Sequence, residues 1–141
     1  MILYLDTSSL VKLYVEEKDS SKIADLVIAS EISATSLIAY AESRSAFARR
    51  FREKAFTARE YKRLVNAFNA DWNNYFIINV TTELVKFAGE LAENHHLRGF
   101  DAIHLSSALT LYRELSSSVI FSCYDKNLQN ASKLEKLEQP K

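Results

Sequence analysis

Four acidic residues stand where apolar segments begin or end, and their chemistry is the most specific in the chain. Asp6 follows the apolar run 2–5, Asp125 follows a second apolar run, Asp101 opens a helical stretch and Glu42 lies within another. A carboxylate beside a buried segment is unfavourable unless a positive partner meets it. If the fold brings the four together, the natural partner is a hard divalent cation and the natural chemistry is cleavage of a phosphate ester.

Each acid alone has a simpler explanation. Asp6, Asp101 and Asp125 could all be helix N-caps, a position where Asp is common. Glu42 could belong to a solvated helix face that it shares with neighbouring arginines. The combination is harder to explain in this way, because two carboxylates about 4 Å apart repel by roughly 4 kcal/mol at an effective dielectric constant near 20. A cluster of four therefore needs a cation or a proton to relieve it.

Strand and helix patterns alternate along the chain. Strand patterns cover residues 2–6, 32–35, 76–80 and 119–123. Helical patterns run through residues 7–14, from the Ser and Asp residues at 19–21 onward, and through 36–54, 57–74, 81–96 and 101–115. Strands separated by helices predict an α/β fold with a parallel sheet and right-handed crossovers.

The expected elements place the acids at one edge. Asp6 and Asp125 lie at or just beyond the carboxyl ends of the first and last strands, and ligands bind at that edge in open α/β sheets. Asp101 heads the inward stripe of its helix, four residues before Leu105. Glu42 and Arg49 share a helix face about 10 Å apart, so a carboxylate and a guanidinium point the same way. This arrangement suits a metal site with an adjacent phosphate contact.

Composition places few limits on function. A chain of 141 residues fits one domain, expected at 1–131 and followed by a polar tail at 132–141. Lys+Arg and Asp+Glu are equal at 18 each, so any nucleic-acid surface must be local. The single cysteine excludes an internal disulfide, and no apolar run reaches the roughly 18 residues of a membrane span. We expect a cytoplasmic protein.

Three segments together resemble a known family. Residues 4–14, 39–47 and 97–105, followed by a strand and residues 125–128, are similar to PIN-domain proteins, specifically VapC-type toxin ribonucleases. The resemblance implies a three-layer α/β/α fold with a central parallel sheet of four to five strands flanked by helices. It also implies an acidic site that binds Mg²⁺ or Mn²⁺ and an activity that cuts RNA.

The family's four acidic positions correspond one for one to Asp6, Glu42, Asp101 and Asp125, with Asp6 and Asp101 as direct metal ligands. Two departures from the family pattern are visible. Cys123 stands where a small hydroxyl residue is usual, which leaves the role of Asp125 open. The polar segment 134–138 replaces a common final apolar strand, which leaves the sheet edge open.

Physics and resemblance together predict a Mg²⁺-dependent endoribonuclease that hydrolyses phosphodiester bonds with a metal-activated water. Thr7 or Ser8 could hydrogen-bond a ligand carboxylate, although helix capping explains them equally well. Arg49 could contact a substrate phosphate. His104 is interpreted as a buried, hydrogen-bonded histidine, because a hard Mg²⁺ site prefers oxygen. The resemblance further implies a toxin of a type II toxin–antitoxin pair, with an antitoxin partner and a homodimer.

Several other functions can be weighed on the sequence. A haloacid-dehalogenase-like phosphatase needs a second Asp where this chain has Ser8, and a phosphotransfer receiver needs an Asp where it has Thr81. Two alternatives stay open. One is a housekeeping PIN nuclease in RNA maturation or decay, and the other is a non-catalytic PIN-like module that binds protein or RNA.

Overall fold

The computed structural model describes all residues from 1 to 141 as four strands and seven helices. In chain order these are β1 (Ile2–Leu5), α1 (Thr7–Val11), α2 (Ser20–Ala29), β2 (Ile32–Ser36), α3 (Ala39–Arg52), α4 (Ala58–Trp72), β3 (Phe76–Ile78), α5 (Thr82–His95), α6 (Gly99–Leu115), β4 (Val119–Ser122) and α7 (Lys126–Leu134). No helix combines the length and apolar character needed to cross a membrane.

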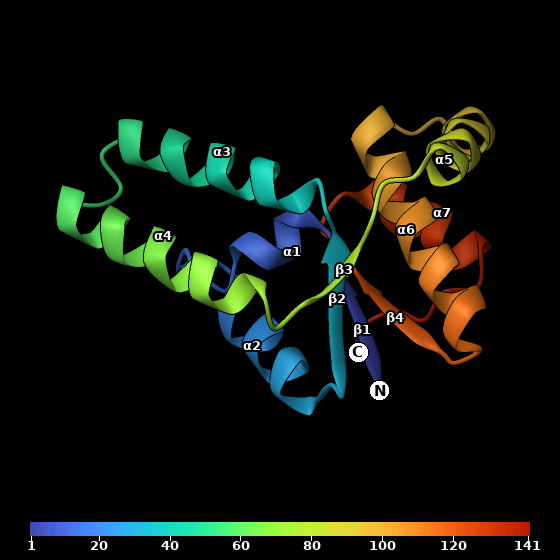
Figure 1. The fold of residues 1–141 in the computed structure, drawn as a ribbon, viewed down its shortest axis with the longest axis horizontal. Helices are drawn as coiled ribbons and strands as arrows, with labels where there is room; N and C mark the ends of the chain where they lie inside the picture. The colour runs from blue at the N-terminus through green and yellow to red at the C-terminus, as the bar shows by residue number, and fades with distance from the viewer.

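The four strands form one parallel sheet in the order β3-β2-β1-β4, so β1 lies inside it between β2 and β4. The α/β fold with a parallel sheet is therefore confirmed, with four strands. Figure 1 shows α1 to α4 on one side of the sheet and α5, α6 and α7 on the other. Parallel strands are joined by crossovers that place helices over both faces, which explains these three layers.

Alternation along β1 builds both halves of the core. Ile2 and Tyr4 pack into a cluster with residues of α5, α6 and α7, whereas Leu3 and Leu5 pack into a second cluster with residues of α1 to α4. Successive side chains of a strand point to opposite faces, so four consecutive apolar residues fit a strand covered on both sides. This continuous burial fixes the end of β1, and with it Asp6, in the middle of the sheet edge.

The C-terminal segment packs against β4 instead of fraying as its polar composition predicts. Leu137 is 5% exposed, and Glu138 forms an isolated parallel bridge with Ile120. The Phe121 N–H donates to the Glu138 carbonyl at 2.8 Å, and the Glu138 N–H donates to the Val119 carbonyl at 3.0 Å. A buried leucine and these backbone hydrogen bonds hold the segment, and a single bridge takes the place of a fifth strand. The domain boundary at residue 131 stays a prediction.

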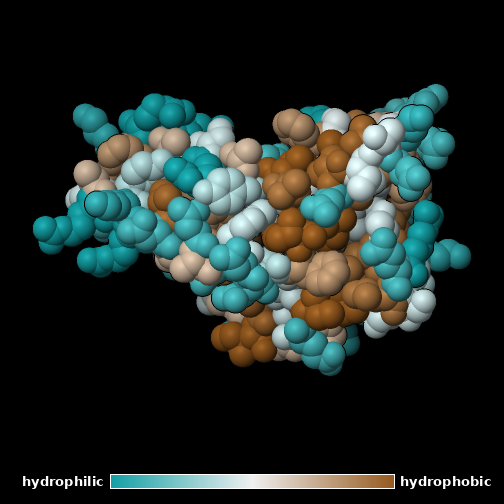
Figure 2. Space-filling view, viewed as in Figure 1, coloured by the Kyte–Doolittle hydropathy of each residue, from teal (hydrophilic) through white to brown (hydrophobic).

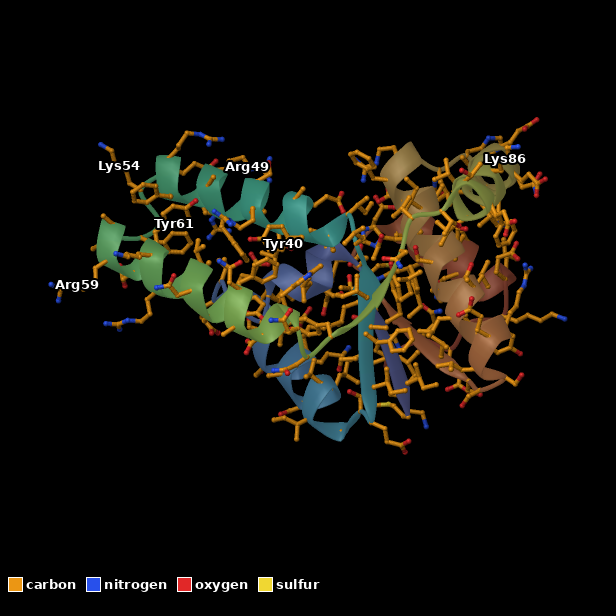
Figure 3. The ribbon with its side chains drawn as sticks, viewed as in Figure 1. Tyr40, Arg49, Lys54, Arg59, Tyr61 and Lys86 are labelled. Atoms are coloured by element: carbon orange, nitrogen blue, oxygen red, sulfur yellow. The ribbon has the colours of Figure 1, made fainter.

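Helices α3 and α4 lie side by side and extend away from the sheet as a hairpin (Figure 1). We call residues 39–72 the α3–α4 arm. Its two helices are held together by aromatic side chains, of which Phe47 and Phe68 are fully buried. Nearer the turn, Phe51 and Tyr61 stack with ring centroids 4.5 Å apart, and Figure 3 labels Tyr61 between the helices. Figure 2 shows the arm covered by hydrophilic residues, whereas apolar residues gather in the middle of the view.

Candidate active site

Asp6 leaves the carboxyl end of β1 and caps α1. Its side chain is 5% exposed, and its Oδ1 accepts hydrogen bonds from the Ser8 hydroxyl at 2.7 Å and the Ser9 N–H at 3.0 Å. No protein donor contacts Oδ2. Burial raises the pKa of Asp6, the charge of His104 and the two hydrogen bonds oppose this, and the charge of Asp101 raises it further. One oxygen is thus fixed by the cap, and the other is free.

Asp101 and Asp125 share one cation, Arg98. The guanidinium of Arg98 lies 3.0 Å from the Asp101 Oδ2 and 3.5 Å from the Asp125 Oδ2. The Oδ1 of Asp125 caps α7 by accepting the Leu128 N–H at 2.9 Å. Two carboxylates from different elements therefore face the same space, where Arg98 relieves their repulsion. The Arg98 side chain is 79% exposed, so water screens this contact strongly.

Glu42 is held by two other residues. Its Oε1 accepts from the Thr7 hydroxyl at 2.6 Å and lies 2.9 Å from the His104 Nε2. Burial acts to raise the pKa of Glu42, but the hydrogen bonds from His104 and Thr7 outweigh it, so the pKa is lowered. Glu42 is therefore ionised at neutral pH, with Oε1 engaged and Oε2 without a protein partner.

His104 connects Glu42 to the core of the protein. As expected from the sequence, it is buried and hydrogen-bonded, with 2% of its surface exposed. Its Nδ1 lies 2.8 Å from the hydroxyl of Tyr4, which is fully buried. Burial raises the pKa of Tyr4 well above its ordinary value, so the hydroxyl keeps its proton and can donate. A carboxylate only accepts, so Nε2 carries a hydrogen toward Glu42, and in the neutral imidazole Nδ1 accepts from Tyr4.

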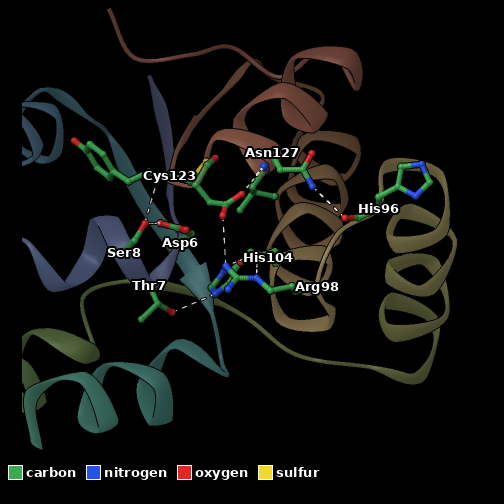
Figure 4. Close-up of polar contacts among 12 residues, drawn as sticks. Asp6, Thr7, Ser8, His96, Arg98, His104, Cys123 and Asn127 are labelled. Atoms are coloured by element: carbon green, nitrogen blue, oxygen red, sulfur yellow. Dashed lines mark hydrogen bonds and ion pairs between the residues drawn. The ribbon is translucent and has the colours of Figure 1, made fainter. Parts of the chain in front are cut away.

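The Cys123 thiol is buried beside this edge and lies 3.8 Å from the backbone carbonyl of Asp125. Burial raises the pKa of the Cys123 thiol, and the charges of Asp6, Asp125 and Asp101 raise it further. The residue that follows β4 is therefore within electrostatic range of all three acids. Figure 4 shows Asp6, Ser8 and Cys123 close to Arg98 and His104 at this edge of the sheet.

The structure brings the predicted acids to one region and leaves Arg49 apart from them. Asp6, Asp101 and Asp125 gather at one edge, and Glu42 joins them through Thr7, whose helix begins directly after Asp6. No three of the His, Cys, Asp and Glu side chains are close enough to hold a metal ion in this arrangement. Arg49 makes no hydrogen bond or ion pair with any of the acids. It lies farther along α3, on the arm (Figure 3).

The N-cap alternative is settled separately for each aspartate. Asp6 and Asp125 do cap α1 and α7 with Oδ1; the Oδ2 of Asp125 faces Arg98, and the Oδ2 of Asp6 has no protein donor. The sequence pattern predicts a helix that opens at Asp101, but α6 begins at Gly99 and is capped by Arg98. Asp101 lies in the first turn, where the helix dipole favours its charge.

Two contributors to the site received no role from the sequence. Arg98 stands three residues before Asp101, a spacing at which opposite charges on a helix meet. That spacing is the signal that could have identified it. Tyr4 lies in a fully buried strand, where a phenol hydroxyl usually requires a partner. Its partner is 100 residues away in the chain, so no local pattern could reveal it.

The donor set suits a hard divalent cation. The free oxygens are carboxylate oxygens, which Mg²⁺ and Mn²⁺ prefer. Asp101 and Asp125 already share a cationic group, the guanidinium of Arg98, and the buried Asp6 has one oxygen without a hydrogen-bond donor. The only sulfur nearby belongs to Cys123, whose raised pKa keeps it a neutral thiol. The residues therefore fit a magnesium-type site better than a zinc site.

Comparisons with known proteins find one family match and two similar proteins. The PIN domain family matches residues 3–134. Ribonuclease VapC45 and Ribonuclease VapC49, from two strains of Mycobacterium tuberculosis, are each 35% identical over 114 residues, covering 78% of this chain and 76% of each relative.

Solved structures share the fold. The VapBC2 structure from Rickettsia felis, bound to a promoter DNA fragment, superimposes with a TM-score of 0.63 at 16% identity, covering 99% of this chain and 97% of the other. FitAcB from Neisseria gonorrhoeae gives a TM-score of 0.64 at 12% identity with the same coverage. A toxin–antitoxin complex from Klebsiella pneumoniae gives a TM-score of 0.58 at 19% identity, covering 90% and 89% of the two chains.

Replacing Asp6 by Asn should stabilise the metal-free protein at neutral pH. Asn caps helices as well as Asp does, its Oδ1 keeps both hydrogen bonds, and the buried charge is lost. Because folding raises the pKa of Asp6, its carboxylate destabilises the fold above that pKa, and this penalty disappears as pH falls toward the unfolded value near 3.8.

Urea unfolding in EDTA, compared at about pH 7 and about pH 4, measures this effect. The free energy of unfolding of Asp6→Asn should exceed that of the wild type at the higher pH, and the difference should shrink at the lower one. Asp25→Asn, an exposed change on α2, is the matched control and should have no effect. Equal stability of wild type and Asp6→Asn at pH 7 would contradict the buried-charge interpretation.

The tautomer of His104 is a second measurable consequence. Two-bond ¹⁵N–¹H correlation spectra should show hydrogen on Nε2 and a bare Nδ1 in the wild type. Tyr4→Phe removes the donor to Nδ1 and should cost about 1–3 kcal/mol of stability, because a buried acceptor is left unsatisfied. A spectrum with hydrogen on Nδ1 in the wild type would refute the assigned direction of this hydrogen-bond chain.

Proposed function

The chain belongs to the PIN-domain family as a VapC-type toxin ribonuclease, and on this premise we propose that it cuts cytoplasmic RNA with a divalent cation held by Asp6, Glu42, Asp101 and Asp125. The preferred ion is Mg²⁺, with Mn²⁺ as an alternative of the same ligand preference. The reaction is hydrolysis of a phosphodiester bond within the RNA strand. The observation that carries the proposal is the pair Asp101 and Asp125, which already share one cationic group at the sheet edge.

The side chains around the acids hold them in the orientation that this chemistry needs. Ser8 and Ser9 fix one oxygen of Asp6, and Thr7 and His104 fix one oxygen of Glu42. Each carboxylate therefore keeps its other oxygen available to a cation. Hydrogen bonds of this kind orient metal ligands and are important for metal affinity.

Arg98 has a distinct part in the proposal. Its guanidinium relieves the repulsion between Asp101 and Asp125 when no metal is bound. Because its side chain is 79% exposed, it can leave the two carboxylates without disturbing the core. A divalent cation carries twice its charge and would replace it. When bound, such a cation acidifies water and stabilises charge on the departing oxygen.

The Asp6→Asn variant should lose metal-dependent cleavage. Total RNA is incubated with the pure protein in Mg²⁺, Mn²⁺ or EDTA, and the new ends are mapped. Wild type and the Asp25→Asn control should cut in the presence of metal, whereas wild type in EDTA and Asp6→Asn should match the buffer blank. Cleavage by Asp6→Asn at the wild-type rate in Mg²⁺ would refute the assigned site. A folded wild type that cuts no RNA would favour the binding-module alternative.

We further propose that the chain pairs with a second copy and with an antitoxin. The structural neighbours are toxin–antitoxin complexes, which supports a protein partner. Exposed apolar side chains support self-association: Phe76 on β3 and Val85 on α5 are 44% and 43% exposed. Figure 2 shows apolar residues gathered in the middle of the view, where Figure 1 places β3. Apolar patches of this kind often mark protein contacts.

Light scattering during gel filtration tests the second copy. The single chain has a mass of 16.1 kDa, and the free protein should elute with twice that mass. Phe76→Glu should shift it toward the monomer, because a charge buried between copies is unfavourable. Glu83→Gln, a change at an exposed position of α5, is the control. A monomeric wild type would contradict the homodimer but would leave the nuclease assignment untouched.

A further inference from the structure

The α3–α4 arm carries a concentrated positive charge. Residues 44–63 contain eight of the chain's 18 lysines and arginines but only two glutamates, which gives this segment a net charge of +6. The whole chain is neutral, so the rest of the molecule carries a net charge of −6. The balanced overall composition therefore conceals a strong separation of charge between the arm and the remainder.

Most of these cations have no partner within the protein. Arg44 contacts Tyr40, and Arg50 pairs with Glu17 at 3.3 Å. Six others are exposed and form no ion pair: Arg49, Arg52, Lys54, Arg59, Lys62 and Arg63. Figure 3 labels Arg49, Lys54 and Arg59 on the outside of the arm, with Lys54 and Arg59 near its tip.

A favourable interaction with the helix dipole explains only part of this charge. Arg49 and Arg52 lie in the last turn of α3, where the helix dipole favours cations. Arg59, however, lies in the first turn of α4, where the same dipole disfavours them, and Arg63 follows four residues later on the same face. The nearby Glu60 is already engaged in the capping box with Thr57. The cations of α4 therefore form no ion pair in the free protein, and Arg59 stands at an unfavourable end of the helix dipole.

The surface is unlike a protein-binding surface. No large hydrophobic side chain of residues 44–63 is exposed, whereas specific protein interfaces usually have an apolar centre. Clustered cations with no exposed large apolar side chain among them suit a polyanion, because binding releases the counterions of its phosphates.

The arm begins at the candidate active site. Glu42, in the first turn of α3, is held by Thr7 and His104, and Arg49 lies seven residues later on the same helix face, about 10 Å away. We propose that the α3–α4 arm binds the phosphate backbone of the RNA that the site cleaves, so that the strand runs from the acids along α3 to the tip. This inference rests on the proposed ribonuclease function for its ligand.

Binding is measured without cleavage in the Asp6→Asn background. A fluorescein-labelled single-stranded RNA of about 20 nucleotides is titrated at several salt concentrations between about 50 and 200 mM, and anisotropy gives the affinity. The arm variant adds Arg52→Gln, Arg59→Gln and Lys62→Gln. The matched control adds Lys22→Gln, Lys86→Gln and Lys133→Gln, three exposed cations outside the arm and the same change in charge. Figure 3 shows Lys86 at the opposite end of the molecule.

Each phosphate contact contributes about 0.7 to the slope of log affinity against log salt for single strands. The arm variant should therefore lose about 2 from this slope and bind roughly 10- to 100-fold more weakly near 100 mM salt, whereas the control should keep most of its slope. Should the triple variant fail to fold by circular dichroism, each single change is measured instead and should lower the slope by about 0.7.

Equal slopes for the arm variant and the control would overturn the inference. So would an arm variant that binds RNA normally but no longer copurifies with a protein partner, because the arm would then be a protein-binding surface. Failure of the nuclease assignment is a separate result, since it requires that the wild type cut no RNA. An arm-dependent slope with no cleavage would keep the RNA-binding arm and reject the enzyme.

Discussion

The buried carboxylate of Asp6 is the constraint on which the site depends. β1 lies inside the sheet and is covered on both faces, so the residue at its carboxyl end cannot turn freely to water. Helix α1 begins immediately and fixes one oxygen through the cap. The other oxygen has no protein donor, and burial disfavours the negative charge of the carboxylate. A cation at this position would therefore stabilise Asp6. Other carboxylates are then brought to the same edge by the ends of β4 and the first turn of α6.

The molecule tolerates these like charges by separate means. Arg98 pairs with both Asp101 and Asp125 from an exposed position, so its side chain can move into water. His104 is buried and hydrogen-bonds to Glu42, and Tyr4 holds the imidazole in place through its other nitrogen. The excess of positive charge lies elsewhere, on the α3–α4 arm. Under the proposed function, the acidic centre that holds a metal stands beside a basic surface that suits the phosphates on either side of the cleaved bond.

Much of the fold was predictable because local rules agreed with the global structure. The unbroken apolar run of β1 and the alternation of strands with helices both gave correct indications. The exceptions were settled by single contacts. Leu137 is buried within a tail whose composition is polar, and α6 starts at Gly99, two residues before Asp101, with Arg98 at the N-cap position. Neither outcome has a signal in the hydrophobic pattern.

By itself, the sequence determined the sheet, the acids at its carboxyl edge and the family to which they belong, because periodicity and residue type are local properties. Only the tertiary structure decided how the acids are held. The Tyr4–His104 contact joins residues 100 positions apart, and His104 then meets Glu42 from another helix. The sequence also showed a neutral chain, whereas the fold separates its charges, since α3 and α4 project together from the sheet and gather exposed cations on one arm. Such contacts depend on which elements pack together, and no local pattern encodes that.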